Sequence, residues 1–149
     1  EIIGDFGLGK RATVFDLNGS RLGVSICYEI IFPDLVRQPV KKGAEFLVNI
    51  TNDAWFGKSA ASYQHISMAA LRAVENRTPI IRAANTGISG IIDATGKLRN
   101  TTQLFTREFV TGEIVPNKGA RTFYSQFGDI FSYLCLVLTV TISFLAYRY

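Results

Sequence analysis

Along residues 12–115, short apolar runs alternate with stretches whose apolar positions recur three or four residues apart. The first pattern predicts strands and the second predicts helices, so the chain is expected to form an α/β layered fold. The predicted strands span residues 12–17, 22–27, 45–51, 79–84, 88–93 and 109–115, the predicted helices span residues 32–42 and 63–76, and residues 116–129 are a predicted linker. Asn18-Gly19-Ser20 separates the first two strands, and Asn-Gly accepts the positive φ of a tight hairpin turn. Pro39 is expected to end or kink the first helix, because proline lacks a backbone N–H.

A different pattern occupies residues 130–147, which run IFSYLCLVLTVTISFLAY without a charge. At about 1.5 Å per residue these residues form a helix about 27 Å long, close to the ~30 Å hydrocarbon thickness of a bilayer. Tyr133 and Tyr147 lie near the ends, where aromatic rings favour the lipid–water boundary. A buried core helix is the alternative, but such helices usually have a polar face. We therefore predict a membrane-spanning helix, with Arg148 on the cytoplasmic side and residues 1–129 on the other.

Composition narrows the classes of protein to which the chain can belong. It has 149 residues, of which 48% are hydrophobic and 19% charged, and this excludes a largely disordered protein. The formal charge of +4 is small and dispersed, with no basic stripe interleaved with aromatics, so no nucleic-acid partner is expected. The chain begins Glu1-Ile2-Ile3 rather than with Met, and we interpret it as part of a longer polypeptide.

Cys27 is the strongest candidate for chemistry. It ends a predicted strand, and Tyr28-Glu29 and a predicted helix follow it. A thiol at such a junction gains exposure and the positive potential of a helix N-terminus, which favours the reactive thiolate. Glu29 is a candidate acid/base or orienting group beside it. The alternative is a small buried apolar side chain, which is the usual role of a lone cysteine in a strand.

The remaining candidates for metal or cofactor chemistry are weak. Cys135 lies inside the predicted span and is not expected to pair with Cys27. One usable cysteine and the single histidine, His65, cannot complete a closed zinc site, so no metal is expected. His65 fits a Cys–His dyad or a structural hydrogen bond, and we favour the structural bond. Residues 4–10 match the GxxxxGK spacing of a phosphate loop, but Arg11 and a predicted strand follow, so we expect a flexible loop and no cofactor.

A third candidate site is the stretch Asn52-Asp53-Ala54-Trp55-Phe56-Gly57, which follows the predicted strand 45–51. Two aromatic residues beside turn-forming residues at the carboxyl end of a strand can form the wall of an apolar substrate site. Trp55 and Phe56 are therefore candidate substrate-binding residues. A loop that packs its aromatic rings into the core fits the pattern equally well.

Taken together, several short motifs resemble the nitrilase superfamily of carbon–nitrogen hydrolases, and most of all its membrane branch, the bacterial apolipoprotein N-acyltransferases. The motifs are, in order, Ile26-Cys27-Tyr28-Glu29, Thr51 to Gly57, Gln64-His65, Arg72-Ala73, Glu75, Arg82 and Asn85-Thr86-Gly87-Ile88-Ser89. The resemblance extends over residues 12–149, including the apolar terminal segment. Several motifs in one order are more specific than any single one.

The resemblance implies an α/β fold, the C-terminal part of a nitrilase-like αββα sandwich (residues 1–129), periplasmic at the bacterial inner membrane. One transmembrane helix (residues 130–147) and a cytoplasmic end (residues 148–149) follow. The implied catalytic triad is Glu-Lys-Cys with Cys27 as the nucleophile, Tyr28 and Glu29 match the family's Tyr and Glu, and Trp55 matches its active-site-loop Trp. The family's base Glu and its Lys lie upstream of Glu1, and Lys10 is too close to Cys27 for that role. We therefore expect residues 1–149 alone to be inactive.

The implied activity moves a fatty acyl chain from a membrane phospholipid, through a Cys thioester, to the N-terminal amine of diacylglyceryl-cysteine on apolipoproteins. The implied partners are the phospholipid donor, the diacylated lipoprotein acceptor and the membrane itself. Two alternatives stay open. One is a membrane-tethered carbon–nitrogen hydrolase, in which water resolves the acyl-enzyme. The other is a non-catalytic membrane module that contacts lipid or a partner through residues 55–56.

Overall fold

The structure is a computed structural model that describes residues 9, 11–119 and 121–148. Its centre is a six-stranded sheet in the order β1-β2-β3-β4-β5-β6. The strands are β1 Val14–Leu17, β2 Ser20–Ile26, β3 Phe46–Asn52, β4 Ile80–Asn85, β5 Gly90–Ile92 and β6 Leu98–Arg99. β2, β3 and β4 are parallel, whereas β1, β5 and β6 pair antiparallel with their neighbours. The carboxyl ends of the three parallel strands therefore meet at one edge of the sheet.

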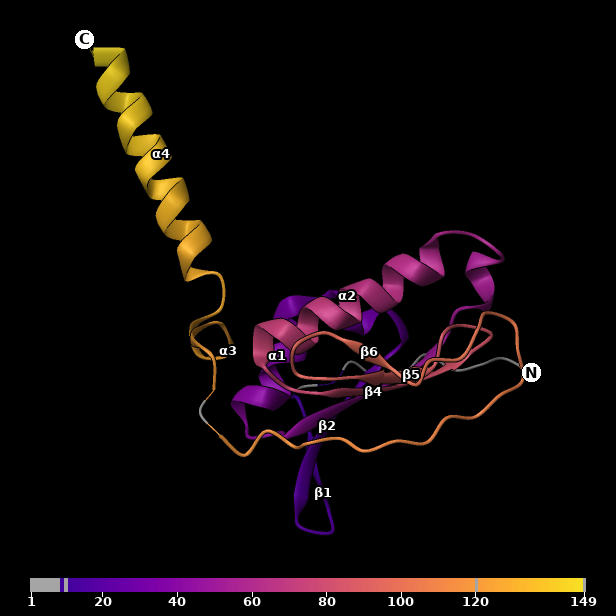
Figure 1. The fold of residues 1–149 in the computed structure, drawn as a ribbon. Coiled ribbons are helices and arrows are strands. Elements are labelled where there is room, and N and C mark those ends of the chain that lie inside the picture. The colour runs from indigo at the N-terminus through magenta and orange to yellow at the C-terminus, as the bar shows by residue number, and fades with distance from the viewer. Residues whose placement is uncertain (1–8, 10, 120, 149) are drawn as a thin grey trace.

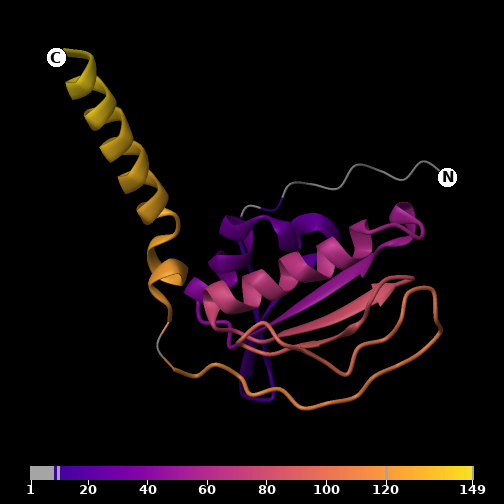
Figure 2. The same ribbon diagram turned by 45° about the horizontal axis from the view of Figure 1, so that its top comes forward.

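The helices are η1 Cys27–Ile31, α1 Pro33–Lys41, η2 Ala54–Phe56, α2 Ala61–Asn76, α3 Phe123–Phe127 and α4 Ile130–Arg148. α1 and α2 cover one face of the sheet, and Figure 2 shows α2 lying along the strands. The apolar core lies between these helices and the sheet. It includes Ile30, Val36, Val40, Leu47, Ile66, Ala69, Ala73, Ile80 and Ile92. On β2 and β3, Val24, Ile26 and Ile50 are exposed. The described residues thus form one helix layer and one sheet layer, which is half of an αββα sandwich.

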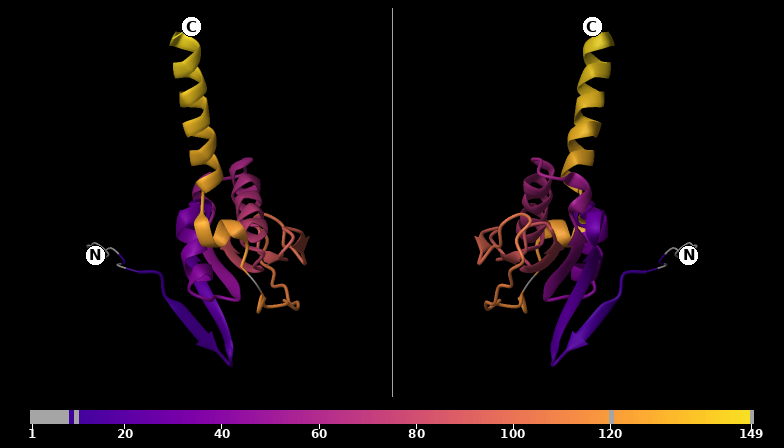
Figure 3. Two further views of the ribbon diagram at one scale, coloured as in Figure 1. Left: turned by 90° about the vertical axis from the view of Figure 1, so that its left-hand side faces the viewer. Right: turned by 90° about the vertical axis from the view of Figure 1, so that its right-hand side faces the viewer.

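α4 leaves the sandwich and projects away from it (Figures 1 and 3). It begins at Ile130, as predicted, and ends one residue beyond the predicted span, at Arg148. Within the described residues it is the one helix long and apolar enough to cross a membrane by length and composition, and none of that stretch is buried against the rest of the protein.

Pro39 does not end the first helix at once, because α1 continues to Lys41. Its buried ring packs against β2 at Gly23, where an added Cβ would lie 2.5 Å from the Pro39 Cβ. The absence of a side chain at Gly23 allows this close approach, and the ring contributes apolar contact in place of its missing hydrogen bond.

The strand predicted over residues 109–115 is wrong. Phe109 and Val115 are 89% and 85% exposed, and the segment forms no ladder within the described part of the chain. A strand needs a partner edge, and here the chain crosses β5 instead, so close at Gly112 that a Cβ would lie 2.7 Å from Cδ1 of Ile91. The predicted linker 116–129 in turn contains the short helix α3. The predicted loop 4–10, Lys10 included, lies outside the described residues except for Gly9.

Candidate active site

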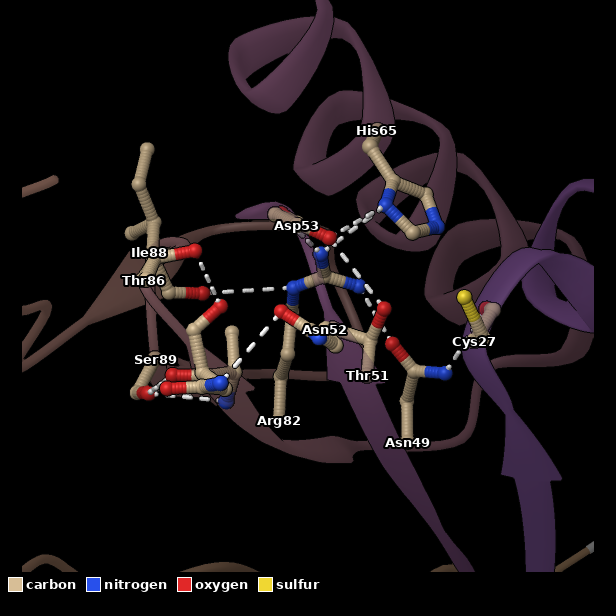
Figure 4. Close-up of polar contacts among 12 residues, drawn as sticks. Cys27, Asn49, Thr51, Asn52, Asp53, His65, Arg82, Thr86, Ile88 and Ser89 are labelled. Atoms are coloured by element: carbon tan, nitrogen blue, oxygen red, sulfur yellow. Dashed lines mark hydrogen bonds and ion pairs between the residues drawn. The ribbon is translucent and has the colours of Figure 1, made fainter. Parts of the chain in front are cut away.

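Cys27 is the first residue after β2 and the first residue of η1. Its backbone has φ +53°, in the left-handed region that residues other than glycine and asparagine rarely adopt. Such a conformation costs about 1–3 kcal/mol and persists only where surrounding contacts hold it. The side chain is partly exposed, so the sharp turn from strand to helix presents the thiol at the sheet edge (Figure 4). A strained strand-to-helix turn is also the device that exposes the serine nucleophile of α/β-hydrolases.

Glu29 holds this turn from its own side. Its Oε2 accepts a hydrogen bond of 2.7 Å from the backbone N–H of Ile26, the last residue of β2. A carboxylate at the third position of a helix that binds the backbone N–H of the preceding cap residue fixes the entry of the chain. Of the two roles expected for Glu29, this contact is that of an orienting group.

Asn49 holds the turn from the neighbouring strand β3 (Figure 4). Its side chain is fully buried, and its Nδ2 donates to the carbonyl oxygens of Ser25 and Cys27 at 3.2 and 3.3 Å. The parallel register that pairs Ser25 with Asn49 brings the amide to this position. The carbonyl of the strained residue is therefore held by a rigid strand.

Arg82 of β4 lies behind Asn49 and is also buried, with 2% of its surface exposed. Its Nη1 donates to Oδ1 of Asn49, and its Nη2 donates to Oδ2 of Asp53 at 2.9 Å. Its Nε donates to the carbonyl oxygen of Ile88 at 3.2 Å. The buried Asp53 supplies the negative charge that a buried guanidinium requires. At Gly87, an added Cβ would lie 2.4 Å from Oδ2 of Asp53.

His65 of α2 completes the buried cluster. Its Nδ1 lies 3.0 Å from Oδ1 of Asp53 and 3.1 Å from Nη2 of Arg82, so the structural hydrogen bond predicted for it is present. Burial lowers the pKa of His65, and the charge of Arg82 lowers it further, against the opposing effects of Asp53 and of the Cys27 carbonyl. The ring is therefore neutral near pH 7. Its Nε2 has no hydrogen-bond partner within the described residues.

Two aromatic side chains lie close to the ring of His65. The rings of Tyr28 and Phe56 have centroids 5.5 and 5.8 Å from that of His65, and they lie 6.4 Å from each other. Phe56 is partly buried, Tyr28 is about half exposed, and Trp55 is 80% exposed. The structure thus gathers Cys27, Tyr28, Glu29 and Phe56 at one edge of the sheet, and it leaves the Trp55 ring free to meet another surface.

Sequence reasoning did not predict the cluster of Asn49, Asp53 and Arg82 as a unit. A signal was available, because Asn49 and Arg82 interrupt the apolar strands LVNIT and IIRAAN, and buried polar side chains need partners. No group of three or more His, Cys, Asp or Glu side chains able to hold a metal ion occurs in the described ranges.

The fold and this edge define a nitrilase-like α/β domain with a cysteine at a strained strand-to-helix turn. The amidase of Nesterenkonia sp. AN1, solved with acrylamide added at its active-site cysteine, has the same fold: TM-score 0.55 and 20% identity over 66% of this chain and 41% of the amidase chain. The carbon–nitrogen hydrolase family model matches residues 4–123, and the chain belongs to that family.

Two curated relatives are similar to this chain over most of its length. The apolipoprotein N-acyltransferase of Geobacter metallireducens is 48% identical over 98% of this chain, and apolipoprotein N-acyltransferase 1 of Treponema denticola is 37% identical over 89%. The similarity to the Geobacter protein includes almost the whole chain, and it therefore extends beyond the family match into α4. The chain spans 28% and 24% of the length of these two relatives.

Proposed function

We propose that this chain is part of a membrane-bound acyltransferase. The protein would transfer a fatty acyl chain from a phospholipid, through a thioester on Cys27, to the N-terminal amine of a diacylglyceryl-modified cysteine on an apolipoprotein. The observation that carries the proposal is the combination, in one chain, of a cysteine held at a positive-φ turn and an apolar helix joined to the same domain. The names of the relatives point to the same reaction.

The reaction follows from thiol chemistry in two steps. In the first, the Cys27 thiolate attacks the ester carbonyl of the phospholipid, the C–O bond to glycerol breaks, and the lysophospholipid leaves with a proton. In the second, the neutral amine attacks the thioester, the C–S bond breaks, and the thiolate is regenerated while the amine loses a proton. A thiolate both attacks and leaves readily, so ping-pong kinetics are expected.

The residues around Cys27 take distinct roles in this scheme. The backbone N–H at Tyr28 is a candidate donor to the tetrahedral oxyanion, and a donor of this kind contributes about 3–4 kcal/mol. Tyr28, Phe56 and Trp55 offer apolar surface for the acyl chain. Glu29 orients the turn through the N–H of Ile26. The base Glu and the Lys donor implied by the family resemblance are not assigned to residues of this chain.

The membrane is the third component of the proposal. α4 crosses the bacterial inner membrane, residues 1–129 lie on its periplasmic side, and Arg148 lies at its cytoplasmic end. Both substrates are lipids with their reactive groups near the bilayer surface. Tethering the domain there raises the effective concentration of each substrate at Cys27.

The test is product analysis with the full-length parent protein in vesicles, given a phospholipid donor and a diacylated lipopeptide. We expect N-acyl lipopeptide and lysophospholipid in equal amounts, and both should disappear in Cys27→Ser. Free fatty acid or ammonia without N-acyl lipopeptide would instead favour a hydrolase, in which water resolves the acyl-enzyme. Lipid binding without any turnover, unchanged in Cys27→Ser, would identify a non-catalytic module.

A further inference from the structure

α3 is a helix of five residues between the sandwich and α4, and it is docked rather than free. Ser125 is fully buried, and its hydroxyl donates to Oδ1 of the equally buried Asn76 at 2.9 Å. Thr122 caps α3 by accepting from the N–H of Ser125, and its hydroxyl donates to the carbonyl oxygen of Glu75 at 2.6 Å. These polar contacts fasten α3 to the last turn of α2.

The exit from α3 is fixed as well. Gly128 ends the helix with φ +67°, and an added Cβ there would lie 3.1 Å from Cζ of Arg37 on α1. Asp129 follows, and its carbonyl oxygen accepts from the N–H of Tyr133 in the first turn of α4. α3 therefore contacts both helices of the sandwich, and only Gly128 and Asp129 separate it from α4 (Figures 1 and 3).

The same turn of α2 is bonded to the helix that begins at Cys27. Nη1 of Arg72 donates to the carbonyl oxygen of Ile31, the last residue of η1, at 2.9 Å. Nη2 of Arg72 donates to Glu75 at 2.8 Å, and the carbonyl oxygen of Arg72 accepts from Asn76 at 2.9 Å. A continuous set of hydrogen bonds thus joins α3, the C-terminal turn of α2 and η1.

The outward side of α3 is aromatic. Phe123 and Phe127 are 62% and 56% exposed, and their rings lie in contact, with centroids 4.7 Å apart and planes tilted by 38°. Aromatic rings so close to the start of an apolar helix match the lipid–water boundary, where amphipathic and aromatic groups collect. The bilayer surface that α4 enters is the surface that these two rings would meet.

We propose that α3 is a rigid joint that sets the height and orientation of Cys27 at the bilayer surface. The Ser125–Asn76 hydrogen bond attaches the inner side of α3 to α2. The outer side of α3 places Phe123 and Phe127 in the lipid interface. The inference rests on the proposed membrane crossing of α4. A catalytic domain on a loose tether would sample many orientations, whereas this joint selects one in which the thiol meets lipid carbonyls.

The test uses the full-length protein in phospholipid vesicles with Cys27 as the only thiol, so every other cysteine, Cys135 included, is replaced by Ser. A donor fluorophore on Cys27 and acceptor-labelled lipids report the distance from Cys27 to the bilayer surface, and this readout does not depend on activity. Ser125→Ala removes the Ser125–Asn76 hydrogen bond. Ser67→Ala is the matched control, because the Ser67 hydroxyl donates to the carbonyl oxygen of Tyr63 within α2. Inserting Gly-Ser-Gly-Ser after Gly128 is a second variant, which keeps α3 docked and frees it from α4.

Ser125→Ala and the insertion should each lower the mean energy-transfer efficiency and broaden its distribution. Ser67→Ala should leave both unchanged. In unlabelled protein, Ser125→Ala and the insertion should each reduce acyl transfer from bilayer phospholipid by about tenfold or more, since small misplacements of reacting groups cost that much. Alkylation of Cys27 by water-soluble iodoacetamide should stay within about twofold of the parent rate, since the turn itself is intact.

An energy-transfer efficiency that is unchanged in the insertion variant would overturn the proposal that α3 is a rigid joint. A parallel loss of alkylation and acyl transfer would also overturn it. A parent protein without acyltransferase activity would refute the proposed function. The energy-transfer comparison would still test whether α3 fixes the distance of Cys27 from the bilayer.

Discussion

Replacing Asn49 with alanine is the perturbation that most directly tests how the protein holds its strained cysteine. The fully buried amide of Asn49 donates to the carbonyl oxygens of Ser25 and Cys27 and accepts from Arg82. In Asn49→Ala both carbonyls lose this donor, and Nη1 of Arg82 loses its acceptor inside the protein. The φ of +53° at Cys27 then loses the contact from β3 that opposes its relaxation.

The size of the effect follows from these contacts. Two lost hydrogen bonds at about 1 kcal/mol each, and one orphaned buried donor at about 1–3 kcal/mol, sum to about 3–5 kcal/mol. A domain of this size is stable by about 5–15 kcal/mol, so the variant should fold but unfold at much lower urea concentration. Asn52→Ala is the control on the same strand, because Asn52 accepts from the backbone of Ala54 near the surface.

The assay pairs urea unfolding with the rate at which the full-length protein forms an acyl-enzyme from phospholipid. We expect Asn49→Ala to lower that rate by about tenfold or more at urea-free conditions, and Asn52→Ala to stay within about twofold. If Asn49→Ala is destabilised yet acylates at the parent rate, the β3 contact supports the fold only. If the free energy of unfolding of Asn49→Ala equals that of the parent, the predicted loss of stability is refuted.

Three further outcomes are expected. Glu29→Gln keeps an acceptor for the N–H of Ile26 and should retain most acyl-enzyme formation, whereas Glu29→Leu should lose it; equal losses would make Glu29 an acid or base instead. Because its folded-state pKa lies below the ordinary 6.5, His65 takes up protons more readily in the unfolded chain, so stability should fall as the pH drops below about 6.5. That loss should be smaller in His65→Asn, and identical pH profiles by thermal unfolding would contradict the assignment. Trp55→Ala should change stability by less than about 0.5 kcal/mol, since the ring is 80% exposed, but should raise the KM for phospholipid; an unchanged KM would remove Trp55 from the substrate surface.

The sequence predicted the elements that depend on local pattern. The hairpin around Asn18-Gly19, the strands that become β3 and β4, the helix α2 and the helix α4 all follow from turn chemistry and periodicity. Cys27 could be singled out for the same reason, because its position at the end of a strand is a local property. The carbon–nitrogen hydrolase family that the motifs predict is confirmed by the family match over residues 4–123.

Features that depend on distant partners were not predictable in this way. Asn49 and Arg82 are separated by 33 positions, and only the parallel register of β3 and β4 places their side chains in contact. The strand predicted over 109–115 contains β-branched and aromatic residues, which favour strands, but it meets no partner edge in the described chain. The docking of α3 likewise depends on Asn76, which lies 49 positions before Ser125. Strand pairing and burial between residues far apart in the sequence determine these features.

The most direct test of the central claim is mass spectrometry of the full-length protein after incubation with phospholipid vesicles and no acceptor. The account predicts a mass gain of one acyl chain, mapped to the peptide that contains Cys27, labile to hydroxylamine and absent in Cys27→Ala. An acyl group on any other residue, or lipid turnover while Cys27 stays unmodified and replaceable by alanine, would contradict it.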